Sequence, residues 1–193
     1  MVFDIGGVLE LTPRLGVTER WETALGLPAG HIDTHMASSW AAGALGVITE
    51  EDVQRELTAL LGTDADAFMA DVWTEYLGTL NTGLTAYLRD LRPRYRTGIL
   101  SNSFVGARER EQAAYGFADL VDHLVYSHEA GLAKPDPRAY LLVCERLGVA
   151  PEEAVFLDDV AAYVTGARRV GMRAVLYRDN AQAVAALDAL LGR

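Results

Sequence analysis

The chain opens with Met1-Val2-Phe3-Asp4-Ile5-Gly6-Gly7-Val8, a short apolar run that ends in one aspartate and two glycines. An aspartate followed by glycine is an ordinary turn signal. The second interpretation is a buried strand that delivers a single carboxylate to a glycine-rich turn. That arrangement is more typical of a functional site than of an ordinary element of the fold. Only three residues precede Asp4, which is short for a central strand, so a start of the chain a few residues upstream is an open alternative.

Strand and helix patterns alternate from residue 84 to the end of the chain. The apolar pattern predicts strands at residues 97–100, 124–126, 154–157 and 174–177, and helices at 84–91, 105–115, 137–147, 161–170 and 181–191. Alternation of this kind predicts an α/β fold, with a Rossmann-like parallel sheet core and helices on both faces.

A helical block separates the first strand from this alternation. Thr49 followed by three acidic residues is a helix start, and apolar residues recur at helical spacing before and after it. One strong helix is predicted from Phe68 to Leu80. We therefore predict two parts: an α/β core domain of residues 1–12 and 82–193, and a helical insert of residues 13–81. Trp21, Trp40 and Trp73 are interpreted as packing core of the insert.

Polar residues gather where the predicted strands end. Open parallel sheets bind ligands at the carboxyl ends of their strands. Each residue there has a structural alternative as a helix cap or a solvated loop residue, and any one alternative is at least as plausible as function. It is much less plausible that every one of these polar residues at the same edge of the sheet has only a structural role. The residues are Asp4, Ser101-Asn102, Lys134 and Asp158-Asp159.

The chemistry of this edge is coherent. Three converging carboxylates repel one another and have perturbed pKa values, which a hard divalent cation relieves. Mg²⁺ takes a few carboxylates, water and a substrate phosphate as ligands. Ser101, Asn102 and Lys134 would then supply donors to the phosphate oxygens, which leaves Asp4 as a nucleophile that forms an aspartyl-phosphate. Lys134 is the one lysine beside sixteen arginines, as expected where a compact charge is needed; composition bias is the alternative.

Composition excludes several other classes. The chain has 193 residues, half of them apolar, and 23% charged residues, which indicates one folded domain with at most a smaller insert. A net charge of -10 argues against a nucleic-acid partner. No apolar run reaches the ~20 residues of a membrane span, no signal peptide is visible, and the single cysteine, Cys144, forms no internal disulfide. We expect a cytoplasmic protein without a membrane partner, whose oligomeric state the sequence does not indicate.

Four motifs in order resemble those of the haloacid dehalogenase-like (HAD) hydrolase superfamily, and they span nearly the whole chain. The helical insert resembles the small helical cap of that superfamily, and its residues 40–52 are similar to caps of sugar-phosphate phosphatases. The motifs are Phe3-Asp4-Ile5-Gly6-Gly7-Val8-Leu9, Leu100-Ser101-Asn102-Ser103, Gly131-Leu132-Ala133-Lys134-Pro135-Asp136-Pro137, and Val155-Phe156-Leu157-Asp158-Asp159 with Gly166-Ala167 and Gly171-Met172 after it.

The resemblance implies a role for each of these polar residues. Asp4 would be the nucleophile and a Mg²⁺ ligand, and Lys134 would neutralise both Asp4 and the phosphoryl group. The remaining roles are phosphoryl binding by Ser101 and Asn102, a carbonyl ligand to Mg²⁺ from Gly6, a metal ligand from Asp158, and direct or water-mediated ligation by Asp159.

Two positions depart from the resemblance. Phosphatases of this superfamily usually carry a second aspartate two residues after the nucleophile, which protonates the leaving group, and this chain has Gly6 there. General acid catalysis is typically worth ~10²–10⁴-fold, so slower turnover or a leaving group that needs less help is expected. Tyr163 stands where relatives often have asparagine.

These observations predict a Mg²⁺-dependent phosphomonoester hydrolase that acts on a small phosphorylated metabolite. One alternative is a 2-haloacid dehalogenase-type hydrolase, which also lacks the second aspartate but works without a metal, where the pair Asp158-Asp159 is electrostatically awkward. Another alternative is a non-catalytic member of the fold that binds a phosphorylated ligand or a protein. A phospho-acceptor receiver domain has its acidic residues in a different order.

Overall fold

The computed structural model describes residues 1–193. Five strands form one sheet in the order β5-β4-β1-β6-β7, and all of their pairings are parallel. The predicted parallel α/β fold is therefore confirmed. The strands are β1 (Val2–Phe3), β4 (Gly98–Ser101), β5 (His123–Tyr126), β6 (Val155–Asp158) and β7 (Arg173–Leu176).

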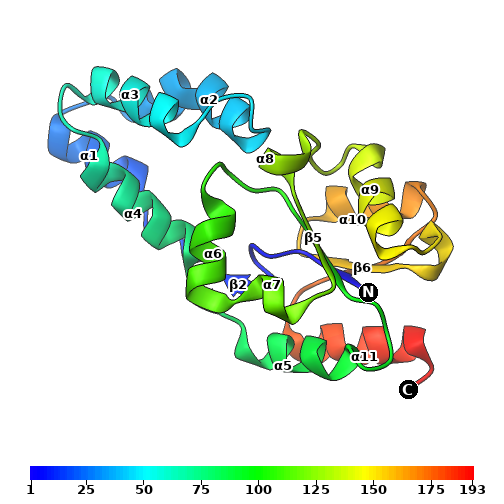
Figure 1. The fold of residues 1–193 in the computed structure, drawn as a ribbon. Coiled ribbons are helices and arrows are strands. Elements are labelled where there is room, and N and C mark those ends of the chain that lie inside the picture. The colour runs from blue at the N-terminus through cyan, green and yellow to red at the C-terminus, as the bar shows by residue number, and fades with distance from the viewer.

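Helices cover both faces of the sheet (Figure 1). Phe3 packs in one core with residues of α5 and α11, and the adjacent Val2 packs in another core with residues of α9 and α10. This alternation follows from the two-residue period of a strand. The helices after the insert are α5 (Thr82–Leu91), α6 (Ala107–Tyr115), α7 (Phe117–Leu120), α8 (Ser127–Ala130), α9 (Pro137–Leu147), α10 (Ala161–Arg169) and α11 (Asn180–Leu191), with a 3₁₀ turn at Pro151–Glu153.

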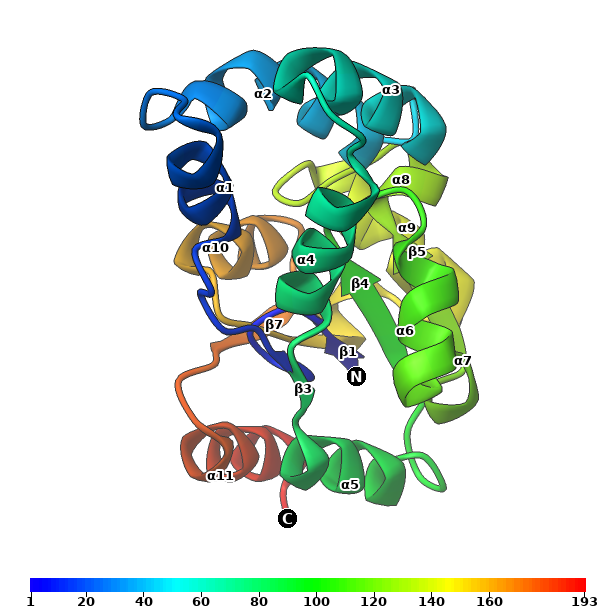
Figure 2. The same cartoon turned by 90° about the vertical axis from the view of Figure 1, so that its left-hand side faces the viewer.

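Four helices form the helical insert, which stands away from the sheet (Figure 2). They are α1 (Val17–Leu25), α2 (His31–Ala44), α3 (Glu50–Leu61) and α4 (Asp66–Leu77), and they share a hydrophobic core of their own. The predicted helix start at Thr49 is confirmed: Asp52 N–H donates to Thr49 Oγ1 at 3.2 Å, and Thr49 N–H donates to Asp52 Oδ2 at 3.0 Å. Local capping chemistry therefore sets where α3 begins.

A short antiparallel pair joins the insert to the core. Strand β2 (Glu10–Leu11) pairs with β3 (Thr79–Leu80). The prediction of a helix up to Leu80 was therefore wrong in its last turn. The helix ends at Leu77 because Gly78 has a φ of 54°, and a Cβ there would lie 2.3 Å from the carbonyl oxygen of Leu11. None of the helices combines the length and apolar character that crossing a bilayer requires.

Candidate active site

Asp4 lies at the centre of the carboxyl-terminal edge of the sheet. Strand β1 is the middle strand, with β4 on one side and β6 on the other. The N–H of Asp4 donates to the carbonyl oxygen of Leu157 at 2.9 Å, so β6 fixes the position of Asp4. The chain passes from β1 to β4 and β5 on one side and then to β6 and β7 on the other. Asp4 therefore marks the switch point at which open parallel sheets bind ligands.

Lys134 lies between two of the predicted carboxylates. Its Nζ is 2.7 Å from Asp4 Oδ1 and 2.6 Å from Asp158 Oδ2, and its side chain is 0% exposed. Burial works against the charged form of Lys134, but Asp4 and Asp158 outweigh burial and raise its pKa. The only lysine of the chain is thus a buried cation that two buried carboxylates hold in place.

Asp159 adds a third carboxylate beside this ion pair. One oxygen from each of Asp4, Asp158 and Asp159 lies within 4.8 Å of the others. Burial raises the pKa of Asp4 to about 7 against the opposing effect of Lys134, and burial together with Asp158 raises the pKa of Asp159. One ammonium thus leaves an excess of negative charge, and these oxygen donors fit a hard divalent cation such as Mg²⁺.

Two adjacent glycines form the turn after Asp4, and their surroundings differ. Gly7 has a φ of 74°, and a Cβ on it would lie 2.3 Å from Asp159 Oδ2. Glycine is favoured there, because any other residue would adopt a strained left-handed φ and would displace the Asp159 carboxylate. A Cβ on Gly6 would have no heavy atom within 4 Å. Position 6 therefore has room for a side chain, while its carbonyl remains a predicted metal ligand.

The side chain of Asn102 is occupied by the backbone of Lys134. Asn102 Nδ2 donates to Lys134 O at 2.9 Å, and Lys134 N–H donates to Asn102 Oδ1 at 2.7 Å. The side-chain amide therefore positions Lys134, and phosphoryl binding by Asn102 stays a prediction. Ser101 is buried at the end of β4, and its Oγ lies a long 3.4 Å from the Asn102 carbonyl oxygen. We call the following residues the polar rim: Asp4, Ser101, Lys134, Asp158 and Asp159.

Two buried glutamates near Asp4 were not predicted. Glu10 and Glu111 are 1% and 0% exposed. Tyr126 Oη donates to Glu111 Oε2, whereas Oε1 of each glutamate has no hydrogen-bond partner. Burial is the main reason that the pKa of Glu10 rises to about 9 and that of Glu111 to about 7, and the charge of Asp4 adds to both shifts. The one signal in the sequence is that Glu10 interrupts an apolar run.

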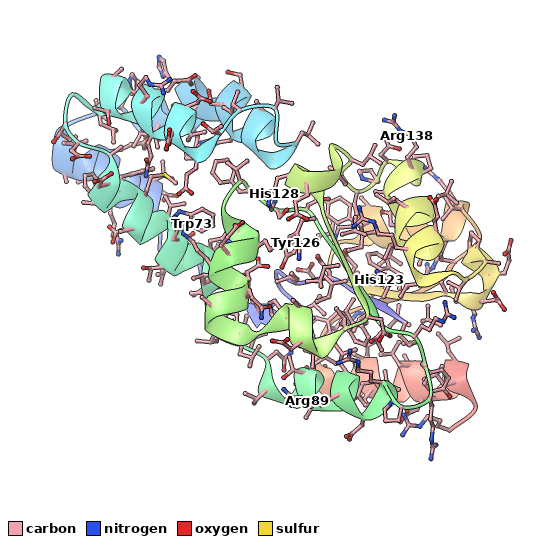
Figure 3. The ribbon with its side chains drawn as sticks, viewed as in Figure 1. Trp73, Arg89, His123, Tyr126, His128 and Arg138 are labelled. Carbon is pink, nitrogen blue, oxygen red and sulfur yellow. The ribbon has the colours of Figure 1, made fainter.

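The helical insert contacts the core beside α6 and α8. Arg110 of α6 donates two hydrogen bonds to Glu50 at 2.9 Å each, and Trp73 Nε1 donates to the same carboxylate at 2.8 Å. The Arg110 guanidinium also stacks 4.1 Å from the centroid of the Trp73 ring, and Figure 3 shows Trp73 reaching toward α6. Ser127 Oγ donates to Ala44 O at 2.7 Å. The insert is thus tied to α6 and α8 of the core besides the β2–β3 connection.

Comparison with known proteins identifies the class to which this fold and site belong. The sequence model of the haloacid dehalogenase-like hydrolase family matches residues 1–171. The chain belongs to this family and is a HAD-like hydrolase.

Individual relatives agree with this assignment. Phosphatase MT3486 from Mycobacterium tuberculosis (strain CDC 1551 / Oshkosh) is 45% identical over 89 residues, which are 45% of this chain and 41% of the relative. A predicted HAD-like family hydrolase from Porphyromonas gingivalis superposes with a TM-score of 0.84 at 25% identity, over 100% of this chain and 97% of that one.

A HAD family enzyme from Bacteroides thetaiotaomicron, solved in complex with magnesium and inorganic phosphate, shares the fold. Its TM-score is 0.80 at 21% identity, over 95% of this chain and 96% of that one. The chain spans about two fifths of the length of several curated relatives that it matches.

Proposed function

We propose that this hydrolase is a Mg²⁺-dependent phosphomonoester hydrolase that acts on a small phosphorylated metabolite through an aspartyl-phosphate on Asp4. The observation that carries the proposal is the contact of Lys134 Nζ with both Asp4 and Asp158, with the Asp159 carboxylate beside them. The similarity to a mycobacterial phosphatase supports it. So does the shared fold with an enzyme that binds magnesium and inorganic phosphate.

The polar rim has the donors that a magnesium ion requires. Asp4, Asp158 and Asp159 would hold it, since they are oxygen donors around a point with excess negative charge. The carbonyl of Gly6 would be a further ligand, as the resemblance implies. When bound, the ion would neutralise the phosphoryl oxygens and the carboxylates together. Lys134, which contacts both Asp4 and Asp158, would add to this neutralisation.

The reaction needs two displacements at phosphorus. A carboxylate oxygen of Asp4 forms a bond to phosphorus as the bond from phosphorus to the ester oxygen breaks, and the leaving alkoxide takes a proton from water. Water then attacks the phosphorus of the aspartyl-phosphate, which releases inorganic phosphate and restores Asp4. Ser101 Oγ and the main-chain N–H of Asn102 would donate to the phosphoryl oxygens. Gly6 has no side chain to supply the proton of the leaving group.

We further propose that residues 13–81 act as a cap over this site, and that residues 1–12 and 82–193 form the catalytic core. The cap would exclude water from the reaction and contact the leaving group. Its contacts with α6 and α8 hold it against the core.

The proposal is tested by measuring phosphate release from phosphorylated sugars, nucleotides, glycolytic acids and acetyl phosphate, with Mg²⁺ and with excess chelator. We expect turnover only with Mg²⁺, and a loss on the order of 10³-fold or more in Asp4→Asn. The exposed Asp90→Asn is the matched control and is expected to keep the wild-type rate. Circular dichroism checks that both variants fold.

Three results would contradict the proposal. Wild-type rates in Asp4→Asn would show that Asp4 is not the nucleophile. Full activity on a 2-haloacid in excess chelator would favour the dehalogenase alternative. Binding of Mg²⁺ without hydrolysis of any ester would favour a non-catalytic member of the fold.

A further inference from the structure

A cavity of about 380 Å³ lies between the helical insert and the core. This volume is at the small end of the range for ligand pockets. The ring centroids of Trp40 and Phe104 are 5.4 Å apart, and those of Trp73 and Phe104 are 6.1 Å apart, so a core side chain packs between two tryptophans of the insert. We call this space the aromatic cavity, and its aromatic lining residues are Trp40, Phe68, Trp73, Tyr76 and Phe104.

The aromatic cavity borders segments that lead to the polar rim. Phe104 follows Asn102 by two residues on the loop after β4, and Thr12 of the lining follows Glu10 by two. Tyr76 lines the aromatic cavity near the end of α4. Burial, and after it the charges of Glu111, Glu10 and Asp4, raise its pKa. Figure 2 shows α4, which carries Tyr76, running from the rest of the insert toward the sheet.

The lining is mostly apolar and has no cation. Its polar groups are the hydroxyls of Thr12, Thr18 and Tyr76, the indole N–H groups of Trp40 and Trp73, and two carboxylates. Its charged residues are Asp33 and Glu75, and Glu75 Oε2 already accepts the N–H groups of Leu15 and Val17 at 3.0 and 3.3 Å. The indole N–H of Trp73 is committed to Glu50 at 2.8 Å. A carboxylate placed here would meet two carboxylates and no cation, and most of the surface around a polyhydroxyl group would be apolar.

We propose that the aromatic cavity receives the leaving group of the substrate, and that this group is an uncharged, predominantly apolar alcohol with a ring or a branched chain. The inference rests on the proposed phosphatase function. It differs from the sugar phosphate that the resemblance of residues 40–52 suggests, because a sugar presents several hydroxyl groups and the aromatic cavity presents mainly ring faces and edges.

The test compares phosphate esters of alcohols on the Mg²⁺-loaded protein, so that leaving-group chemistry is similar and shape and polarity vary. Benzyl phosphate and cyclohexylmethyl phosphate represent the apolar class, and glycerol 1-phosphate and glucose 6-phosphate the polar class. We expect kcat/KM to be about 10- to 100-fold higher for the apolar esters. Equal values for the two classes would overturn the inference.

Two variants test whether the preference arises in the aromatic cavity. Val72 lines it, so Val72→Asp is expected to lower kcat/KM for benzyl phosphate by about tenfold more than for acetyl phosphate, whose leaving group is small. Val47 is 73% exposed on the insert, and Val47→Asp is expected to keep the wild-type preference. Thermal unfolding of both variants checks that they fold, and Val72→Leu replaces Val72→Asp if the latter does not.

The outcomes separate this inference from the proposed function. If acetyl phosphate and the polar esters are hydrolysed without any preference for the apolar esters, the proposed phosphatase function stands. The inference of an apolar leaving group would then be contradicted. An equal loss of kcat/KM on all esters in Val72→Asp would also contradict the inference of an apolar leaving group. No hydrolysis of any ester with Mg²⁺ would overturn both.

Discussion

The polar rim and the aromatic cavity differ in what fixes their residues. In the polar rim, Lys134 contacts two carboxylates at 2.7 and 2.6 Å, so replacing one member leaves an uncompensated buried charge. In the aromatic cavity, rings pack at centroid distances of 5.4 and 6.1 Å, and other apolar side chains of similar volume could fill the same space. Electrostatics therefore specifies residue identity in the rim, whereas packing specifies only size and polarity in the cavity.

The largest test of this comparison is the removal of the cation from the polar rim. Lys134→Met leaves Asp4 and Asp158 without a partner, and we expect the free energy of unfolding to fall by about 3–5 kcal/mol in chelator. Turnover should be lost as well. Urea denaturation followed by circular dichroism measures the first effect, and phosphate release the second.

The matched control for this prediction is the exposed ion pair of Arg138 and Asp136, whose side chains are 71% and 29% exposed. Arg138→Met should change the free energy of unfolding by less than about 1 kcal/mol. If Lys134→Met is as stable as Arg138→Met, solvent or another group compensates the charges of Asp4 and Asp158. Electrostatics would then not determine which residues the polar rim requires.

The two glycines after Asp4 give a sharper test within the rim. Gly7→Ala forces a Cβ against Asp159 at a φ of 74°, and we expect a loss of roughly 1–3 kcal/mol in stability together with weaker Mg²⁺ binding. Gly6→Ala meets open space and should change stability by less than about 0.5 kcal/mol. Urea denaturation and Mg²⁺ titration by calorimetry measure the two effects, and equal losses in both variants would contradict the difference between the glycines.

The open space at position 6 also allows the missing acid to be added. Gly6→Asp places a carboxyl where related phosphatases carry their proton donor, and we expect kcat on alkyl phosphates to rise, by at most ~10²-fold. The rise should be smaller on p-nitrophenyl phosphate, because that leaving group needs little protonation. An equal rise on both substrates would show that the new carboxyl does not act as the acid.

The parts of the molecule that the sequence predicts are those in which one physical signal dominates. Apolar segments ending at Asp4, Ser101 and Asp158 indicated the strands, and parallel strands bring their carboxyl ends to one edge. The cap at Thr49 was also predictable, because it depends on a local pattern. Lys134 stood out by its residue type alone.

The remaining features depend on long-range contacts. Leu80 continued an apolar helical pattern, yet Gly78 ends the helix where it meets Leu11. Glu10 read as an ordinary polar residue because glutamates are mostly exposed, and its burial comes from the fold around β2 and β3. Trp40 packs against the core of the insert as predicted, and it also lines the aromatic cavity, which exists only because Phe104 of the core reaches the insert.

Glu10 and Glu111 belong neither to the polar rim nor to the aromatic cavity. The pH dependence of the free energy of unfolding can show whether they are ionised, like the carboxylates of the rim, or protonated. Burial raises the pKa of Glu10 to about 9 and of Glu111 to about 7, from 4.5. Between these values the folded protein holds protons that the unfolded chain has released, so the free energy of unfolding falls as pH rises from about 4.5 toward 9. This is the opposite of the pH dependence of a salt-bridged carboxylate, and it would mean that the two glutamates differ from the ion pairs of the polar rim.

Two variants measure this effect. Glu10→Gln and Glu111→Gln each remove one titrating group, so the loss of stability between pH 6 and pH 9 should be smaller than in the wild type. We expect a difference of about 3–4 kcal/mol for Glu10→Gln and of about 1 kcal/mol for Glu111→Gln. The neighbours of Glu111 are Tyr126, Tyr76, Asp4 and Arg108, and they stay unchanged in these variants. Exposed Glu145→Gln serves as the control and should follow the wild-type curve. Urea denaturation gives the free energy of unfolding of all four proteins as a function of pH. Parallel curves would mean that both glutamates are already ionised in the folded protein and that nearby groups compensate their charges, as in the polar rim.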